Sequence, residues 1–331
     1  MWRAIGDAVQ GRSHLKTNTP CQDKTYIKKI PTGVIAALAD GAGSAKLSHY
    51  GAEQVTRTIC DYLDENYEVL FNEDNGVKVK RTLLETVLLN LDLICEENKC
   101  SRYDLASTLQ VIAIKNDSYI LIHLGDGAIG YLKGNNLKVA SVPNNGEFIN
   151  ETIFTTSSNA IKALQIKKGM INEIAGFVLM SDGPEVSLYN KQEKNLVNNI
   201  KKVMLNCSLL TDEKAQLIIR ETLENTLKNK TMDDCSLIIV VDDEKVIHYL
   251  LQDNEYKGKV CGIKSDDPKY IAKKLKMFSE LLDYTKEPKQ LDQIAEHLNV
   301  RNKTAKKRMA SLEAYRIIEN RDGYYHSNLT F

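Results

Sequence analysis

Acidic residues recur in this sequence where short apolar segments end or beside tight glycine turns. The apolar run at 34–39 leads into Asp40 and a glycine, and the run at 177–180 leads into Ser181 and Asp182. Carboxylates gathered where strands end can meet at one edge of a sheet, and their oxygens are ligands that Mg²⁺ and Mn²⁺ prefer. Two such ions about 4 Å apart activate a water and neutralise charge on a phosphoryl group. The candidate ligands are Asp23, Asp40, Asp126, Asp182 and Asp233.

Taken singly, each aspartate has a simpler explanation, because Asp and Gly are common turn residues. The elements that would position them as a set are short strands and two long helical patterns. Apolar residues recur at helical spacing after Ser48, and a second helical pattern runs over 79–97. Strand-like runs at 108–114 and 119–124 are joined by a polar turn. This order of elements predicts an α+β layered domain with largely antiparallel sheets.

Short blocks of sequence surround the aspartates, in the order Cys21-Gln22-Asp23, Ala39-Asp40-Gly41-Ala42-Gly43-Ser44, Gly51-Ala52-Glu53, Ala106-Ser107-Thr108, Leu124-Gly125-Asp126-Gly127, Met180-Ser181-Asp182-Gly183 and Asp233-Asp234-Cys235-Ser236. In this order they resemble the PPM-type, or protein phosphatase 2C, family of metal-dependent serine/threonine phosphatases, most closely its short bacterial branch. The resemblance covers residues 1 to about 245. It implies a four-layer αββα sandwich, in which two antiparallel sheets are flanked by helices and the metals lie in a cleft at one edge.

The resemblance also implies a set of metal ligands for two Mg²⁺ or Mn²⁺ ions, and in some members a third, weaker ion. Asp40 would bridge the two ions, and the Gly41 carbonyl would ligate one of them. Asp182 and Asp233 would complete the second site. The implied ligands are Asp23, Asp40, Gly41, Asp126, Asp182 and Asp233.

Two of these ligands have subsidiary roles in the family. Asp23 would act near an ion through water, and Asp126 would help to hold the third ion. The implied reaction is hydrolysis of phosphoserine or phosphothreonine in proteins by direct attack of a metal-bound water, without a phosphoenzyme. Relatives are often paired with a cognate serine/threonine kinase. The implied catalytic residues are Asp23, Asp40, Asp182 and Asp233.

The chain departs from the family pattern at several positions. Gln22 replaces a glutamate, Ala42 stands where some members have a histidine general acid, and Asp234 replaces an asparagine. The family's phosphate-binding arginine has no counterpart in register, since Arg12 and Lys16 are the nearest basic residues. These changes motivate a rival hypothesis, a DNA-binding regulator with a degenerate phosphatase-like domain that senses or scaffolds. The retained aspartates favour the enzyme, because a domain released from catalysis need not keep them.

The pattern changes after a polar, turn-forming stretch at 250–268, which we interpret as a linker. Apolar spacing then predicts helices around 271–278, 291–298 and 305–312, followed by a hairpin turn at 320–323. Helix, helix, turn, helix and β-ribbon is the outline of a winged helix. The sequence therefore predicts a phosphatase domain at 1–249, the linker, and a small winged helix-turn-helix domain at 269–331.

The charge of the chain is balanced as a whole but not in its parts. Lys and Arg number 44, as do Asp and Glu, whereas residues 264–331 carry 14 basic and 10 acidic residues. A winged helix with a basic recognition helix can contact DNA, but it can equally be a protein-interaction module with a solvated basic face. Both partners remain open. The candidate contacts are Arg301, Lys303, Lys306, Lys307 and Arg308.

The sequence also bears on where the protein works. Its N-terminus lacks the apolar stretch of a signal peptide, and no run approaches the roughly 18 apolar residues of a membrane span. Seven cysteines without a C-x-x-C pair argue against a disulfide framework or a zinc ribbon. We therefore expect a cytoplasmic protein with reduced thiols and no membrane contact.

Overall fold

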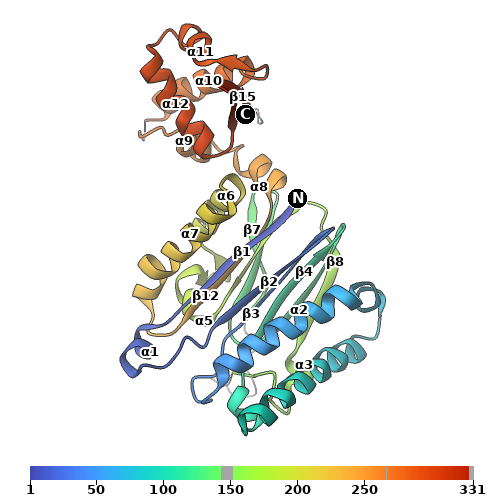
Figure 1. The fold of residues 1–331 in the computed structure, drawn as a ribbon. Helices are drawn as coiled ribbons and strands as arrows, with labels where there is room; N and C mark the ends of the chain where they lie inside the picture. Colours follow the sequence, from blue (N-terminus) through green and yellow to red (C-terminus); the bar gives the residue numbers. More distant parts are fainter. Residues whose placement is uncertain (143–151, 266, 328–331) are drawn as a thin grey trace.

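Two five-stranded antiparallel sheets pack face to face, and helices cover their outer faces (Figure 1). The computed structural model describes residues 1–142, 152–265 and 267–327. The predicted four-layer arrangement of two antiparallel sheets flanked by helices is confirmed. None of the helices within the described ranges is long and apolar enough to cross a membrane.

The first sheet has the order β2-β3-β4-β5-β8 and is covered by α2 and α3. Every residue of β3 after Gly33 is buried, because the strand has a layer on each face. Ile35 and Ala37 pack toward the helices, whereas Val34 and Ala36 pack toward the second sheet. The elements are β2 (Lys24–Ile30), β3 (Gly33–Ala39), β4 (Leu109–Lys115), β5 (Ser118–Leu124), β8 (Gln165–Met170), α2 (Ser48–Asn72) and α3 (Gly76–Asn98).

The second sheet has the order β1-β12-β9-β6-β7, with α6 and α7 against its outer face. Phe177 and Leu179 of β9 face the other sheet, and Val178 and Met180 face the helices. The elements are β1 (Trp2–Val9), β6 (Ala128–Lys133), β7 (Asn136–Ser141), β9 (Ile174–Met180), β12 (Cys235–Asp242), α5 (Asp182–Leu188), α6 (Asn199–Leu209) and α7 (Asp212–Thr222). Shorter elements are α1 (Arg12–Thr17), α4 (Ala160–Ala163), β10 (Tyr189–Asn190), β11 (Asn195–Leu196), a π-helical turn (Leu223–Leu227) and 3₁₀ helices at Arg102–Leu105 and Lys228–Lys230.

The strand register brings the aspartates to one edge of this sandwich. β3 ends immediately before Asp40, and β9 ends two residues before Asp182. β12 pairs antiparallel with β9, so it begins, next to Asp233, at the edge where β9 ends. The turn that contains Asp126 joins β5 of the first sheet to β6 of the second.

Three helices and a three-stranded antiparallel sheet of order β13-β15-β14 form a C-terminal unit beyond α8 (Figure 1). The unit lies at the end of the sandwich opposite α1. Its identification as a winged helix stays a prediction. Its elements are α10 (Pro268–Tyr284), β13 (Lys289–Gln290), α11 (Leu291–His297), α12 (Asn302–Ala314), β14 (Ile318–Arg321) and β15 (Tyr324–Ser327), and α8 spans Asp243–Leu250.

The stretch at 250–268 differs from the irregular linker that we expected. It contains helix α9 (Asn254–Val260), which begins after Asp253, whose side chain accepts a hydrogen bond from the Glu255 N–H at 2.8 Å. Tyr256 and Val260 are buried and belong to a hydrophobic core that continues into the C-terminal unit. Polar residues outnumber apolar ones here, but the few apolar side chains lie on one helical face and pack.

Candidate metal centre and active site

A pocket of about 250 Å³ lies at the edge where the predicted strands end, and carboxylates line it. Two glycines and an alanine of the segment after β3 line it beside these carboxylates. The lining residues are Ser13, His14, Asp40, Gly41, Ala42, Gly43, Thr108, Asp126, Thr152, Phe154, Asp182 and Asp233.

Thr108 fixes the segments that carry Asp40 and Asp126. Its hydroxyl accepts a hydrogen bond from the Asp40 N–H at 2.9 Å, and its own N–H donates to the Asp40 carbonyl at 2.8 Å. Gly125 packs against the same threonine with φ +120°, where a Cβ atom would lie 2.5 Å from the Thr108 Cγ2. Only glycine fits this close approach and this backbone conformation, and it places Asp126 at the pocket.

Asp23 lies beneath the pocket rather than on its surface, with a side chain that is almost completely buried. The Ser181 hydroxyl donates to one of its oxygens at 2.7 Å, and the other oxygen, Oδ1, has no hydrogen-bond partner. Burial raises the pKa of Asp23 to about 7. A carboxyl group in this environment needs either a proton or a cation.

The neighbouring carboxyl groups of Asp40 and Asp182 also have raised pKa values. Burial, followed by the charges of Asp23, Asp182 and Asp126, raises the pKa of Asp40 well above its usual range. Burial and the charges of Asp126 and Asp233 raise the pKa of Asp182 to about 6, and its Oδ1 is also buried without a partner. The site therefore collects negative charge that neighbouring side chains do not neutralise.

These residues fit divalent cations. The two unpartnered oxygens, on Asp23 and Asp182, are hard oxygen donors of the kind that Mg²⁺ and Mn²⁺ bind. Within the described ranges, no three His, Cys, Asp or Glu side chains close around a single point. The coordination of each ion would thus be completed by backbone carbonyls and by waters, several of which Mg²⁺ usually keeps.

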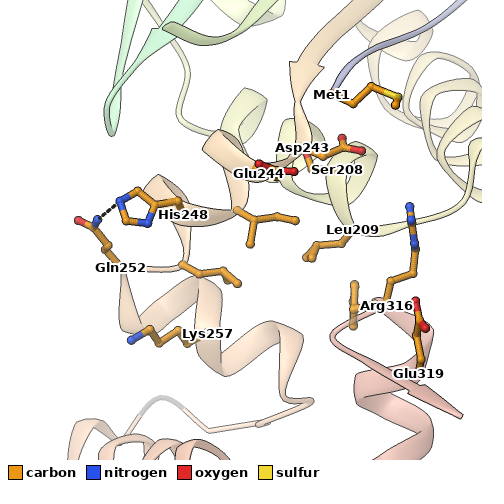
Figure 2. A pocket seen from close by; sticks show the side chains of 13 residues that line it. Met1, Ser208, Leu209, Asp243, Glu244, His248, Gln252, Lys257, Arg316 and Glu319 are labelled. Carbon is orange, nitrogen blue, oxygen red and sulfur yellow. Dashed lines mark hydrogen bonds between the residues drawn. The ribbon is translucent and has the colours of Figure 1, made fainter. Parts of the chain in front are cut away.

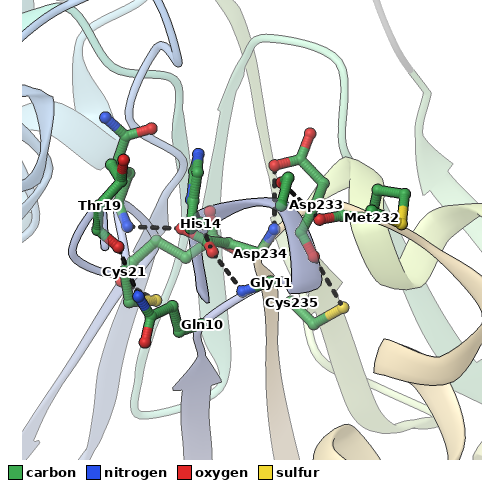
Figure 3. Close-up of polar contacts among 12 residues, drawn as sticks. Gln10, Gly11, His14, Thr19, Cys21, Met232, Asp233, Asp234 and Cys235 are labelled. Carbon is green, nitrogen blue, oxygen red and sulfur yellow. Dashed lines mark hydrogen bonds and ion pairs between the residues drawn. The ribbon is translucent and has the colours of Figure 1, made fainter. Parts of the chain in front are cut away.

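Asp234, next to the predicted ligand Asp233, accepts hydrogen bonds from three groups (Figure 3). Its Oδ1 accepts from the Gly11 N–H at 2.5 Å and from the His14 Nδ1 at 2.9 Å, and its Oδ2 accepts from the Gln22 N–H at 2.6 Å. Gly11 passes so close that a Cβ atom would lie 2.3 Å from the Asp233 carbonyl carbon. Asp234 therefore ties the beginning of α1 and the segment before β2 to the beginning of β12.

His14 was not among the candidates from the sequence, although its side chain lines the pocket. The signal that could have found it is the change of an asparagine to Asp234, which calls for a new partner. Arg12, one of the nearest basic residues, donates from Nε to the Thr231 carbonyl at 2.8 Å, and it does not line the pocket. Lys16 is exposed on α1.

The C-terminal candidates fall into two groups. Four of them are exposed at the beginning of α12, whereas Arg308 is half-buried, with its Nη1 atom enclosed and without a partner. Arg308 stays a candidate contact, with less of its side chain exposed than the other four. The exposed residues are Arg301, Lys303, Lys306 and Lys307.

A larger pocket, of about 780 Å³, lies between α8 and the C-terminal unit (Figure 2). Asp243 and Glu244 lie on one side of it and Arg316 on the other. Its charges are mixed, and it contains none of the predicted ligands. The smaller pocket, which is lined by the predicted carboxylate ligands, is therefore the candidate active site.

Comparisons with known proteins agree with this geometry. A family model described as protein phosphatase 2C matches residues 10–228. Serine/threonine-protein phosphatase 3 of Escherichia coli (strain K12) is 25% identical over 183 residues, which are 53% of this chain and 72% of that protein.

Solved structures show the same fold. A bacterial serine phosphatase superposes with a TM-score of 0.52 at 16% identity, covering 73% of this chain and 98% of that chain. The S. agalactiae serine/threonine phosphatase has a TM-score of 0.51 at 18% identity, covering 73% and 99%. The chain therefore belongs to the protein phosphatase 2C family of serine/threonine phosphatases.

Proposed function

We propose that the protein hydrolyses phosphoserine and phosphothreonine in cytoplasmic phosphoproteins, with Mg²⁺ or Mn²⁺ in the acidic pocket. The observation that carries this proposal is the convergence of four aspartates, from both sheets, on one pocket that is rich in unneutralised carboxylate. Asp233, which lines the pocket, is exposed, so this side of the pocket is accessible from solvent.

The residues that would hold two ions are those of the family pattern. Asp40 would contribute to both ions, the Gly41 carbonyl would contribute to one of them, and Asp182 and Asp233 would contribute to the second. When bound, such ions lower the pKa of a water and neutralise developing charge on the phosphoryl group. Asp126 is placed for a third, weaker ion, and its Oδ2 accepts a hydrogen bond from the Thr152 hydroxyl.

Other groups of the chain orient these ligands. The Ser181 hydroxyl donates to Asp23 and accepts from the Ser236 N–H at 3.1 Å, so it joins the ends of β9 and β12. Asp23 is thereby held in one orientation beneath the pocket, from which it would contact an ion through water. Outer contacts of this kind commonly change metal affinity or activity by 10- to 100-fold, as an order of magnitude.

The test is phosphate release from a phosphothreonine peptide and from p-nitrophenyl phosphate by the full chain, with Mn²⁺, with Mg²⁺ and with EDTA. We expect release with either metal, and none with EDTA or from the Asp40→Asn and Asp182→Asn variants. The matched control is Asp117→Asn in the β4–β5 turn, an exposed aspartate at the end of these strands opposite to Thr108 and Asp126. A folded wild-type protein that releases no phosphate with any metal would instead support the rival, a DNA-binding regulator with a degenerate phosphatase-like domain.

The C-terminal unit has a separate proposed role. We infer that it is a winged helix that brings the enzyme to DNA or to a protein partner, such as a cognate kinase. Two observations support this role. Arg301, Lys303, Lys306 and Lys307 are exposed together, and no residue after Asp233 lines the acidic pocket in the described ranges. The unit thus leaves the pocket open to substrate.

Fluorescence anisotropy with a labelled duplex separates the two kinds of partner. If the unit contacts DNA, binding will weaken with salt, and a triple change of Lys303, Lys306 and Lys307 to Glu will remove it. Full phosphatase activity of the triple variant is the control for folding. Salt-independent or absent DNA binding by the wild-type chain would leave a protein partner as the target.

A further inference from the structure

One side chain able to carry positive charge lines the acidic pocket within the described ranges, and it is His14. The four aspartates of the lining carry a charge that two divalent cations would cancel. A phosphate dianion that enters therefore needs positive charge or strong hydrogen-bond donors from elsewhere in the pocket. The family position for that contact has no arginine here, and the guanidinium of Arg12 is bonded to the Thr231 carbonyl.

The His14 ring is held in one orientation. Its Nδ1 lies 2.9 Å from Asp234 Oδ1, and Asp234 is only 2% exposed. Because Asp234 also accepts from the Gly11 and Gln22 N–H groups, it cannot move to follow another partner. A carboxylate against Nδ1 keeps the proton on that nitrogen, as in other pairs where an acidic group sets the tautomer of a histidine.

The second nitrogen, Nε2, is the one available to a ligand. Figure 3 shows the ring standing over the Asp234 carboxylate, with its other nitrogen directed away from that carboxylate. Within the described part of the chain, Nε2 has no hydrogen-bond partner, and the side chain is 15% exposed. The ring is thus fixed at one end and open to the pocket at the other.

We propose that His14 is a substrate-binding residue whose Nε2–H donates to a phosphoryl oxygen, and that Asp234 is the residue that positions it. This inference rests on the proposed function and names a contact for its substrate. Because Asp234 is anchored by backbone N–H groups, the orientation of the ring is set before substrate arrives.

Two substitutions of His14 test the contacts of its two ring nitrogens separately. In His14→Asn the amide nitrogen stands near the place of Nδ1, so the contact with Asp234 can persist while the donor facing the pocket is lost. In His14→Gln the amide nitrogen reaches the place of Nε2, so a neutral donor to the pocket is kept. Lys16→Ala is the matched control, because Lys16 lies on the same helix but outside the pocket.

The measurement is calorimetric binding of inorganic phosphate to the Mn²⁺-loaded full chain, which needs no turnover. We expect His14→Asn to weaken the phosphate Kd by roughly 10- to 100-fold, the range of a lost charge-assisted hydrogen bond. His14→Gln should weaken it less, and Lys16→Ala should leave it unchanged. In a separate titration, all three variants should bind Mn²⁺ as the wild type does.

Three results would overturn the assignment. One is an unchanged phosphate Kd in His14→Asn with Mn²⁺ binding intact. Another is loss of Mn²⁺ by this variant, which would place His14 at the metal site instead. The third is a loss confined to the phosphothreonine peptide, with phosphate binding and p-nitrophenyl phosphate turnover intact, which would place it at the leaving group. A wild type that binds phosphate through His14 but turns nothing over would contradict the proposed function alone.

Discussion

Buried carboxylates at this edge of the sandwich belong to two regions with opposite environments. Asp23 and Asp182 each have an oxygen that is enclosed without a donor, and burial raises their pKa values to about 7 and about 6. Asp234, equally buried, accepts from two backbone N–H groups and from His14. A carboxylate whose hydrogen bonds are complete organises the chain, whereas one whose hydrogen bonds are incomplete is prepared for a cation.

The largest difference should appear in metal binding and activity. Asp40→Asn and Asp182→Asn should each lower Mn²⁺ affinity and phosphate release by at least about 10²-fold, because even outer contacts of metal ligands have effects approaching that size. Asp234→Asn should retain Mn²⁺ binding, as measured by calorimetry. Equal loss of Mn²⁺ in all three variants would erase the distinction between the two regions.

Stability should respond in the opposite order. Asp234→Asn replaces an oxygen that accepts from the Gln22 N–H with an amide that cannot, so we expect a loss of about 3 kcal/mol in the free energy of unfolding. Urea unfolding in EDTA measures it. If Asp234→Asn proves as stable as the wild type, the three hydrogen bonds do not organise this edge.

The stability of the metal-free protein should depend on pH through Asp23 and Asp182, the carboxyl groups with incomplete hydrogen bonds. The raised pKa values of Asp23 and Asp182 mean that the folded protein binds protons that the unfolded chain has released. This stabilisation is complete below about pH 4 and is lost as the pH rises through 6 and 7, by several kcal/mol. Thermal unfolding in EDTA between pH 5 and 8 tests the direction. Saturating Mn²⁺ should flatten the profile, and a rise in stability over this range would contradict the assignment.

The smallest effect concerns Asp40 without metal. Asp40→Asn removes a carboxyl group whose charged form is disfavoured by burial and by neighbouring aspartates, and it keeps the shape of the side chain, so the metal-free variant should be more stable than the metal-free wild type at pH 8, by about 1 kcal/mol. Paired urea titrations in EDTA measure the difference. The Asp117→Asn control should show no change, and destabilisation by Asp40→Asn would mean that its carboxylate is structurally required.

The sequence was sufficient to predict those parts of the site that depend on the local succession of strands and turns. Asp40 and Asp182 follow buried strands, and Asp126 lies in a glycine turn, so the alternation of strand and turn indicated that they can meet, and the resemblance to the family turned this into an expectation. The structure places these three and Asp233 around one pocket, as expected, and Asp23 below it. Their roles as ligands stay predictions.

What sequence reasoning missed depends on pairs that are far apart in the chain. His14 contacts Asp234, more than two hundred residues later, and neither residue type by itself indicates a contact. Helix α9 was missed because its helical face has only a few apolar residues, and its helical state depends on burial of Tyr256 and Val260 against neighbouring elements. Tertiary contacts decide such cases, and local patterns do not contain them.

The pairing of β1 has a consequence for how the protein is made. β1 pairs along its whole length with β12, from Trp2 opposite Asp242 to Val9 opposite Cys235, and this is its one partner in the sheet. During synthesis the first strand must therefore wait, unpaired, until more than two hundred further residues have left the ribosome. Asp234 arrives on the same late segment. The nascent chain consequently completes its sheet and its active site in one step, near the end of translation of the phosphatase domain.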